Sequence, residues 1–345
     1  MKGYFLYLLK KRIPVLITFT VICLVLFLAT TNAQVYNVVN HPDNYGYAKM
    51  FLQGTILLVY SIVIATLAMI TPIIEFSFKM KKITSNQAYS FPIKRRRLYL
   101  TRYLIGLIEV VIPFLVSYMI SVIIIICDSN IFDIKWFFVY LAAALGFGVL
   151  LYSYITFFYT QANNILDGIV TIFLVCFAPF FLNGMISYFG YHHIYMERVV
   201  CGFPFIPLHL ITEYFSHELF DEVWKLQPYL LTFSIIYIVL FVIALVSFIF
   251  ISQYFKGESA GQKTTSWACY KILLPITLIS GVTMLGFNSS SYALLGLFLV
   301  LTYLSYALRL RKFRLGTKYW IICSAVWACQ IMVFMIGMSI SMFVY

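Results

Sequence analysis

The chain has 345 residues, of which 63% are hydrophobic and only 10% are charged. A soluble domain averages about 45–50% apolar and about 25% charged residues, so this chain lacks the polar surface that a water-soluble globule needs. The composition excludes a soluble catalytic domain and predicts an all-α integral membrane protein. The net charge is +12, and the basic residues are clustered between apolar segments. This pattern is typical of basic loops that orient a membrane protein and contact anionic lipid, and not of nucleic-acid binding.

The first segment, residues 1–12, mixes Lys10, Lys11 and Arg12 with aromatic and aliphatic side chains. This mixture predicts an amphipathic interfacial helix lying on the inner membrane surface. The apolar run that begins at Ile13 extends for about 18 residues, whereas the apolar part of a signal peptide has about 7–15. We therefore expect a retained first span.

Further apolar segments follow along the rest of the chain. A helix that crosses the bilayer needs about 20 mostly apolar residues, because the hydrocarbon core is about 30 Å thick and each residue rises about 1.5 Å. On this rule the sequence predicts a polytopic helical bundle of nine transmembrane helices. The predicted spans are 13–32, 50–75, 103–127, 136–158, 165–185, 229–253, 270–287, 291–308 and 319–342.

The basic residues predict the orientation of the chain. With the N-terminus inside, the inner segments hold 20 of the 24 lysines and arginines, and the outer segments hold Lys49, Lys135, Arg198 and Lys225. Positive charge accumulates on the cytoplasmic side of membrane proteins. We therefore expect a multi-pass protein of the cell (plasma) membrane with a cytoplasmic N-terminus.

The inner loop 76–103 is the most distinctive local feature. Its basic run Lys94–Arg97 follows Pro92 and is explained by anchoring to anionic headgroups. The polar stretch Ile83–Tyr89 is not explained in that way, and it predicts a short helix that starts near Thr84 or Ser85 and protrudes into the cytosol. A cytoplasmic partner protein would bind such a helix.

Glu109 lies inside the third predicted span. A carboxylate among lipid tails costs several kcal/mol, so Glu109 should face the bundle interior or be protonated. Arg102 lies two helical turns away, which favours a partner on another helix. Two interpretations stay open, a polar lining of a substrate path and an interhelical hydrogen bond that holds the bundle together. Glu75 and Asp167 lie near span ends, where we expect them to be solvated.

Catalytic motifs are nearly absent, and the sequence predicts no cofactor, no metal site and no enzyme. The string Gly257–Thr264 resembles a phosphate loop, but it has three residues between the glycines instead of four, and Gln262 precedes the lysine. The string His217–Asp221 has aspartate where a zinc protease helix has its second histidine. His192 and His193 are neighbours that would point apart on a helix, so we interpret these histidines as surface residues.

The segment around the basic run resembles a known family. Residues Ser90–Arg95 read Ser-Phe-Pro-Ile-Lys-Arg, and Leu98–Leu107 then leads to Pro113. This order is similar to the permease subunits of bacterial type-2 ABC exporters, in which a Pro-Ile/Val-x-Arg segment precedes the third span. In that family the preceding loop carries a coupling helix that docks onto the ATPase, and re-entrant outer helices occupy the place of loop 186–228.

The resemblance implies a six-span permease core at 13–260 and a three-span C-terminal extension at 261–345. It implies a transmembrane permease that exports or removes a hydrophobic, drug-like or antimicrobial-peptide-like substrate. The partners would be a separate ABC ATPase subunit and a second permease chain, identical or paralogous. The alternatives are an ion-coupled secondary transporter and a membrane-embedded transferase. The residues expected to couple to the ATPase are Lys82, Ile83, Thr84, Ser85, Asn86, Gln87, Ala88 and Tyr89, with Pro92 and Arg95 fixing the loop against the membrane.

Overall fold

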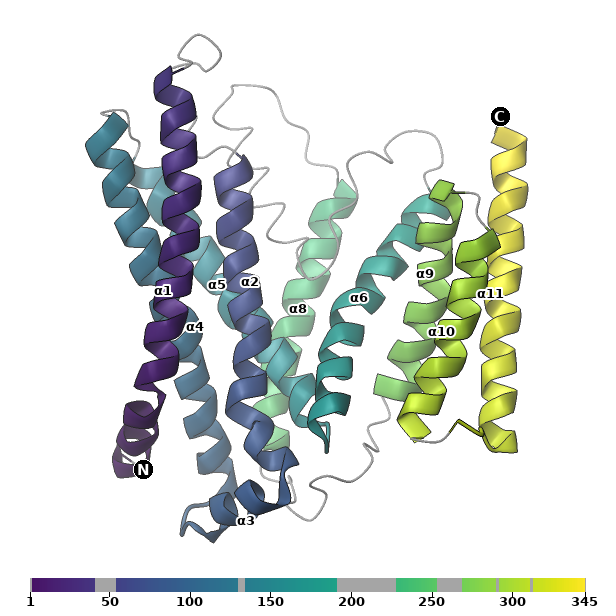
Figure 1. The fold of residues 1–345 in the computed structure, drawn as a ribbon, viewed down its shortest axis with the longest axis horizontal. Coiled ribbons are helices and arrows are strands. Elements are labelled where there is room, and N and C mark those ends of the chain that lie inside the picture. The colour runs from purple at the N-terminus through teal and green to yellow at the C-terminus, as the bar shows by residue number, and fades with distance from the viewer. Residues whose placement is uncertain are drawn as a thin grey trace. The chain divides into compact units, whose positions relative to one another are not determined.

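The computed structural model describes the chain in seven stretches, and all regular structure within them is helical (Figure 1). The prediction of an all-α protein is therefore confirmed for the described residues. These are 2–40, 54–129, 134–190, 228–252, 269–289, 292–310 and 313–344. The elements are α1 (Lys2–Asn40), α2 (Gly54–Phe76), the 3₁₀ turn η3 (Ser77–Met80), α3 (Lys82–Ser90), α4 (Arg95–Ser129), α5 (Ile134–Thr160), α6 (Ile165–Gly190), α8 (Pro228–Ile251), the π-helical turn η5 (Cys269–Leu273), α9 (Leu274–Ser289), α10 (Tyr292–Leu310) and α11 (Thr317–Val344).

Within the described residues, five helical segments are long and apolar enough to cross a bilayer, and four more are apolar but shorter. Each overlaps a span predicted from the sequence, so a helical membrane protein is confirmed, whereas the count of nine spans stays a prediction. The long segments are Gly3–Ala33, Leu58–Met80, Arg95–Cys127, Tyr140–Thr160 and Thr317–Ile336, and the shorter ones are Ile165–Ala178, Ile238–Ile251, Tyr270–Val282 and Leu295–Ala307.

Helix α1 presents apolar side chains to its surroundings along most of its length. Ile17, Val21 and Val25 are 55%, 55% and 58% exposed, which suits contact with lipid tails. The helix begins at Lys2 and continues through Pro14, although proline removes one backbone hydrogen bond. The structure thus differs from the prediction of a separate interfacial helix at 1–12, because these residues and the first span form one continuous helix.

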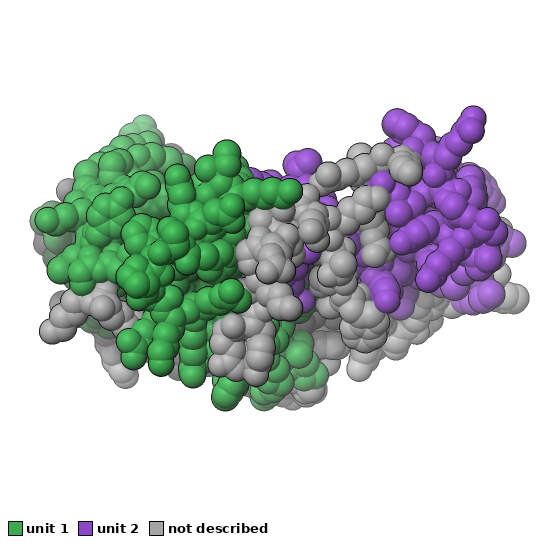
Figure 2. Space-filling view, turned by 90° about the horizontal axis from the view of Figure 1, so that it is seen from below, with its two compact units in different colours: residues 1–160, 205–260 green, residues 161–204, 261–345 purple. Residues whose placement is uncertain are grey.

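The chain divides into two compact units (Figure 2). Unit 1 comprises residues 1–160 and 205–260, and unit 2 comprises residues 161–204 and 261–345. Helix α6 belongs to the predicted six-span core by sequence, but it packs against α9 within unit 2. The division into a transport core and an extension is a functional one and stays a prediction.

Unit 1 is held together by aromatic side chains and by small polar groups between helices. Here α1 packs on α4, α2 packs on α4 and α5, and α5 packs on α8. Phe27 lies against Tyr60 with ring centroids 4.1 Å apart, and Tyr60 meets Tyr118 edge-on at 5.5 Å. The Tyr60 hydroxyl is 2.9 Å from Thr31 Oγ1. Because lipid tails are as apolar as the side chains, such shape-fitting and hydrogen-bonded contacts decide how the helices pair.

Unit 2 has a buried polar contact that joins three of its helices. Gln330 on α11 donates from Nε2 to the Leu278 carbonyl on α9 and to Thr302 Oγ1 on α10, both at 3.0 Å. At one end of α6, Asp167 accepts a hydrogen bond of 2.9 Å from the Tyr270 hydroxyl. Asp167 was expected to be a solvated helix end, and its side chain is partly exposed but also bonded to the π-helical turn η5.

Candidate functional site at the basic end of unit 1

Four chain segments meet at one end of unit 1. They are the first turns of α1, the end of α2, the short helix α3 and the start of α4 (Figure 1). Arg12 on α1 donates from Nη2 to the Ile74 carbonyl on α2 at 3.1 Å, and the Tyr4 and Phe91 rings lie 5.6 Å apart. These contacts bring the basic N-terminal residues beside the basic loop, although the two are far apart in sequence.

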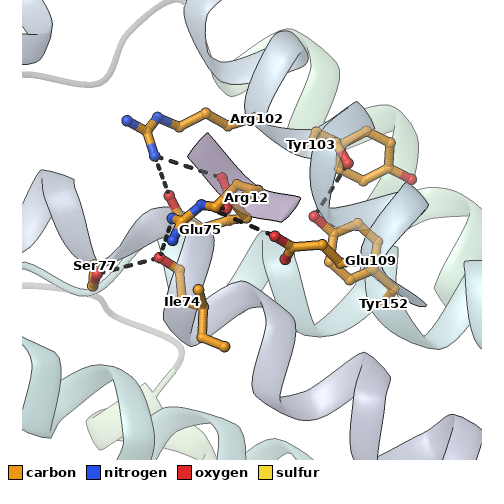
Figure 3. Close-up of polar contacts among 8 residues, drawn as sticks. All are labelled: Arg12, Ile74, Glu75, Ser77, Arg102, Tyr103, Glu109 and Tyr152. Atoms are coloured by element: carbon orange, nitrogen blue, oxygen red, sulfur yellow. Dashed lines mark hydrogen bonds and ion pairs between the residues drawn. The ribbon is translucent and has the colours of Figure 1, made fainter. Parts of the chain in front are cut away.

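Two arginines enclose one carboxylate at this end (Figure 3). Glu75 Oε1 forms an ion pair with Arg12 Nε, and Glu75 Oε2 lies 3.5 Å from Arg102 Nη1. Arg102 also donates to the Glu75 backbone carbonyl at 3.1 Å. The expectation that Glu75 is solvated is therefore wrong, because helices α1 and α4 cover its carboxylate and leave the side chain 1% exposed.

Glu109 extends the cluster toward the interior of unit 1. The residue is fully buried, and its Oε1 lies 4.0 Å from Arg12 Nε. The cation nearest to Glu109 is therefore Arg12 on another helix, as we expected because Arg102 lies two turns away on the same helix. Neither Glu109 oxygen accepts a hydrogen bond from the described residues. Two guanidinium groups and two carboxyl groups thus share one buried region.

Lys79 is a buried charged residue that the sequence analysis did not single out. It lies in η3, is 4% exposed, and its Nζ donates a hydrogen bond to the Thr160 carbonyl at the end of α5. In the sequence Lys79 lies close to Lys81 and Lys82, so nothing distinguishes it from the other basic residues of the loop. Only the approach of α5 identifies it as a residue that ties the end of α2 to a neighbouring helix.

Helix α3, Lys82–Ser90, is the short helix that the loop sequence predicts. It begins two residues before the expected start at Thr84. Thr84 Oγ1 donates to the Phe78 carbonyl at 2.8 Å, and Ser85 and Ala88 are buried against the bundle. The opposite face of α3 is open, and its members Lys82, Ile83, Asn86 and Gln87 are exposed.

The end of α3 is tied to the start of α4. The Tyr89 and Tyr99 hydroxyl oxygens are 2.7 Å apart, and the Arg95 guanidinium lies over the Tyr89 ring at 5.4 Å from its centroid. Burial raises the pKa of Tyr89 above its ordinary value. Pro92 is exposed in the bend between the two helices, and Arg95 begins α4. The residues expected to fix the loop thus lie between α3 and the predicted third span.

Several sequence predictions fall on residues that the structure does not describe. These are most of the outer loop 186–228 with its histidines, the string His217–Asp221 and the string Gly257–Thr264. In the described stretches, no group of three or more His, Cys, Asp or Glu side chains is placed to hold a metal ion.

Apolar helices with a buried polar cluster at one end define the class of this protein, a helical membrane protein. A scan against protein-family models and searches of curated proteins and solved structures each returned no match. The resemblance to exporter permeases therefore depends on the sequence order alone.

Proposed function

We propose that this chain is the permease subunit of an ATP-driven exporter in a bacterial cell membrane, and that α3 receives the movement of a separate ATPase subunit. The observation that carries the proposal is the exposed face of α3. Ile83 on this face is 76% exposed, beside Lys82, Asn86 and Gln87. This face combines one aliphatic side chain with polar neighbours and is directed away from the bundle, and we propose it as the surface that the ATPase subunit contacts.

The contacts behind α3 support a mechanical role. Thr84 links α3 to η3 at the end of α2, and Tyr89 links it to Tyr99 on α4. A force on the exposed face would therefore reach two spanning segments through short, partly buried hydrogen bonds. Arg102 and Glu75 also join these two helices, so α2 and α4 would move together.

The chain would act with a second permease chain, identical or paralogous, and the transport path would run between the two. The resemblance to exporter permeases favours a hydrophobic, drug-like or antimicrobial-peptide-like substrate. Hydrolysis of ATP would take place on the partner subunit. Glu109 is buried beside Arg12 inside unit 1, so it would line this path only after the helices that cover it move apart.

Co-purification tests the proposal. The full chain with a C-terminal tag is solubilised from its native membrane, and an ATPase subunit is sought in the eluate. Ile83→Asp should abolish recovery of this subunit. Phe313→Asp is the matched control, because Phe313 is 79% exposed in a different basic loop. Failure to recover an ATPase with the native chain, or equal recovery with both variants, would refute coupling through α3.

The buried position of Glu75 favours one alternative, an ion-coupled secondary transporter. Such carriers need several acidic residues within the membrane, and Glu75 and Glu109 are two such residues in one cluster. The purified chain alone in liposomes distinguishes the two functions. Substrate movement driven by a proton or sodium gradient, without ATP or another protein, would support the carrier and contradict the exporter.

A further inference from the structure

A cavity of about 440 Å³ lies at the basic end of unit 1, between the first turns of α1, the end of α2 and helix α3. This volume falls within the range of about 300–1,000 Å³ that is typical of small-ligand sites. Its charged lining residues are Lys11, Arg12, Lys81 and Arg102, and none of its lining residues is acidic. The cavity therefore has the composition of a site for an anion.

The charges around the cavity are only partly compensated. Glu75 lies between Arg12 and Arg102 and contacts both, but it does not line the cavity. Lys11 and Lys81 are exposed and form no ion pair within the described residues. Arg102 Nε is buried and donates no hydrogen bond within this part of the chain. Two lysines and one guanidinium nitrogen thus remain as donors for an incoming group.

The position of the cavity along the helices indicates where the anion comes from. Lys11 and Arg12 directly precede the apolar run that begins at Ile13, and Lys81 directly follows the spanning segment Leu58–Met80. These positions correspond to the level of the lipid headgroups. The aromatic side chains of Tyr4 and Tyr7 also line the cavity, and tyrosine is enriched at this depth.

We propose that this cavity binds the phosphate headgroup of an anionic phospholipid. The lysines would contact the phosphate oxygens from α1 and from the residue before α3, so that the bound headgroup joins two segments that hold the α3 region. Basic pockets between spanning helices bind anionic lipid headgroups in this manner. The site is separate from the run Lys94–Arg97, none of whose residues lines the cavity.

The test uses the purified full chain in non-ionic detergent, titrated with phosphatidylglycerol or phosphatidylcholine, with bound lipid counted by native mass spectrometry. Lys11→Gln/Lys81→Gln should weaken phosphatidylglycerol binding about 30-fold, because each lysine near the surface contributes about 1 kcal/mol, or about fivefold in affinity. Arg314→Gln/Lys318→Gln removes the same charge from exposed residues outside the cavity and should leave this binding nearly unchanged.

Three results would overturn the proposal. Equal weakening by the two double variants would mean that general surface charge attracts the lipid. Equal binding of phosphatidylglycerol and phosphatidylcholine would mean that the anionic headgroup is not recognised. Displacement of phosphatidylglycerol by inorganic phosphate at the same free concentration would assign the site to a soluble phosphate and not to a lipid. Thermal unfolding of each variant without lipid confirms that the protein is folded.

Discussion

Arg12 on α1 and Glu75 on α2 form a buried ion pair at the basic end of unit 1, and the same Arg12 nitrogen lies 4.0 Å from Glu109 on α4 (Figure 3). One arginine thus joins the first three long apolar segments of the chain. The pair also lies directly behind the loop that carries α3. A change in this cluster should therefore affect both the stability of unit 1 and the position of α3.

Replacing Glu75 by glutamine should destabilise the protein strongly. The substitution leaves Arg12 and Arg102 partly buried without their shared carboxylate, and breaking a buried ion pair from one side costs about 3–5 kcal/mol. Glu109→Gln is the matched comparison, and we expect less than half of this loss because its nearest guanidinium nitrogen is 4.0 Å away. Thermal unfolding in detergent measures both, and equal losses would contradict the prediction.

Gly106 on α4 should not tolerate a larger side chain. A Cβ atom at this position would collide with the hydroxyl of Tyr152, which is held by its hydrogen bond of 3.2 Å to the Tyr103 carbonyl. Gly106→Ala should therefore lower stability by about 1–3 kcal/mol through overpacking. Gly146→Ala is the control, since a Cβ there meets no atom within 4 Å and alanine favours the helix by about 1 kcal/mol. A loss in both variants would exclude this explanation.

The Tyr89–Tyr99 contact should make the stability of the α3 region depend on alkaline pH. Burial raises the pKa of Tyr89 above its ordinary value of 10.0, so the folded state favours the neutral phenol. The contribution of the neutral Tyr89 phenol to the free energy of unfolding is fully present below pH 10. It is lost as the pH rises through the higher pKa of the folded state, because the phenol of the unfolded chain ionises first.

Tyr89→Phe should cost about 0.5–1.5 kcal/mol at pH 8, and its difference from the native protein should shrink above pH 10. Unfolding midpoints between pH 8 and pH 11 check this expectation. Tyr7→Phe is the control, because Tyr7 is 57% exposed. If the difference between native protein and Tyr89→Phe is the same at pH 8 and pH 11, Tyr89 does not carry the effect.

Gln330 should stabilise unit 2 through its two hydrogen bonds. Gln330→Leu removes the bonds to the Leu278 carbonyl and to Thr302 Oγ1, and each such contact in a membrane bundle is worth about 0.6 kcal/mol on average. We expect a loss of about 1 kcal/mol in unfolding experiments in detergent. Ser324→Ala, which removes an exposed bond within α11, should change stability much less. A stabilised Gln330→Leu variant would show that packing outweighs these bonds.

The sequence by itself determined the features that depend on local composition. Apolar runs of about 20 residues predict the helices, because lipid leaves no other partner for the backbone. The polar stretch after Met80 predicts α3, and the cost of an acid within an apolar helix predicts the burial of Glu109. Each of these follows from a short window of sequence.

Only the tertiary structure decided which charged residues meet. Glu75 was predicted to be solvated and is buried, because Arg12 and Arg102 reach it from two other helices. Lys79 was unremarkable in sequence and is buried against the end of α5. Helix α6 packs with α9, which lies about one hundred residues further along the chain. Hydrophobicity places a helix in lipid but does not choose its neighbours, which are set by shape and a few polar contacts between distant segments.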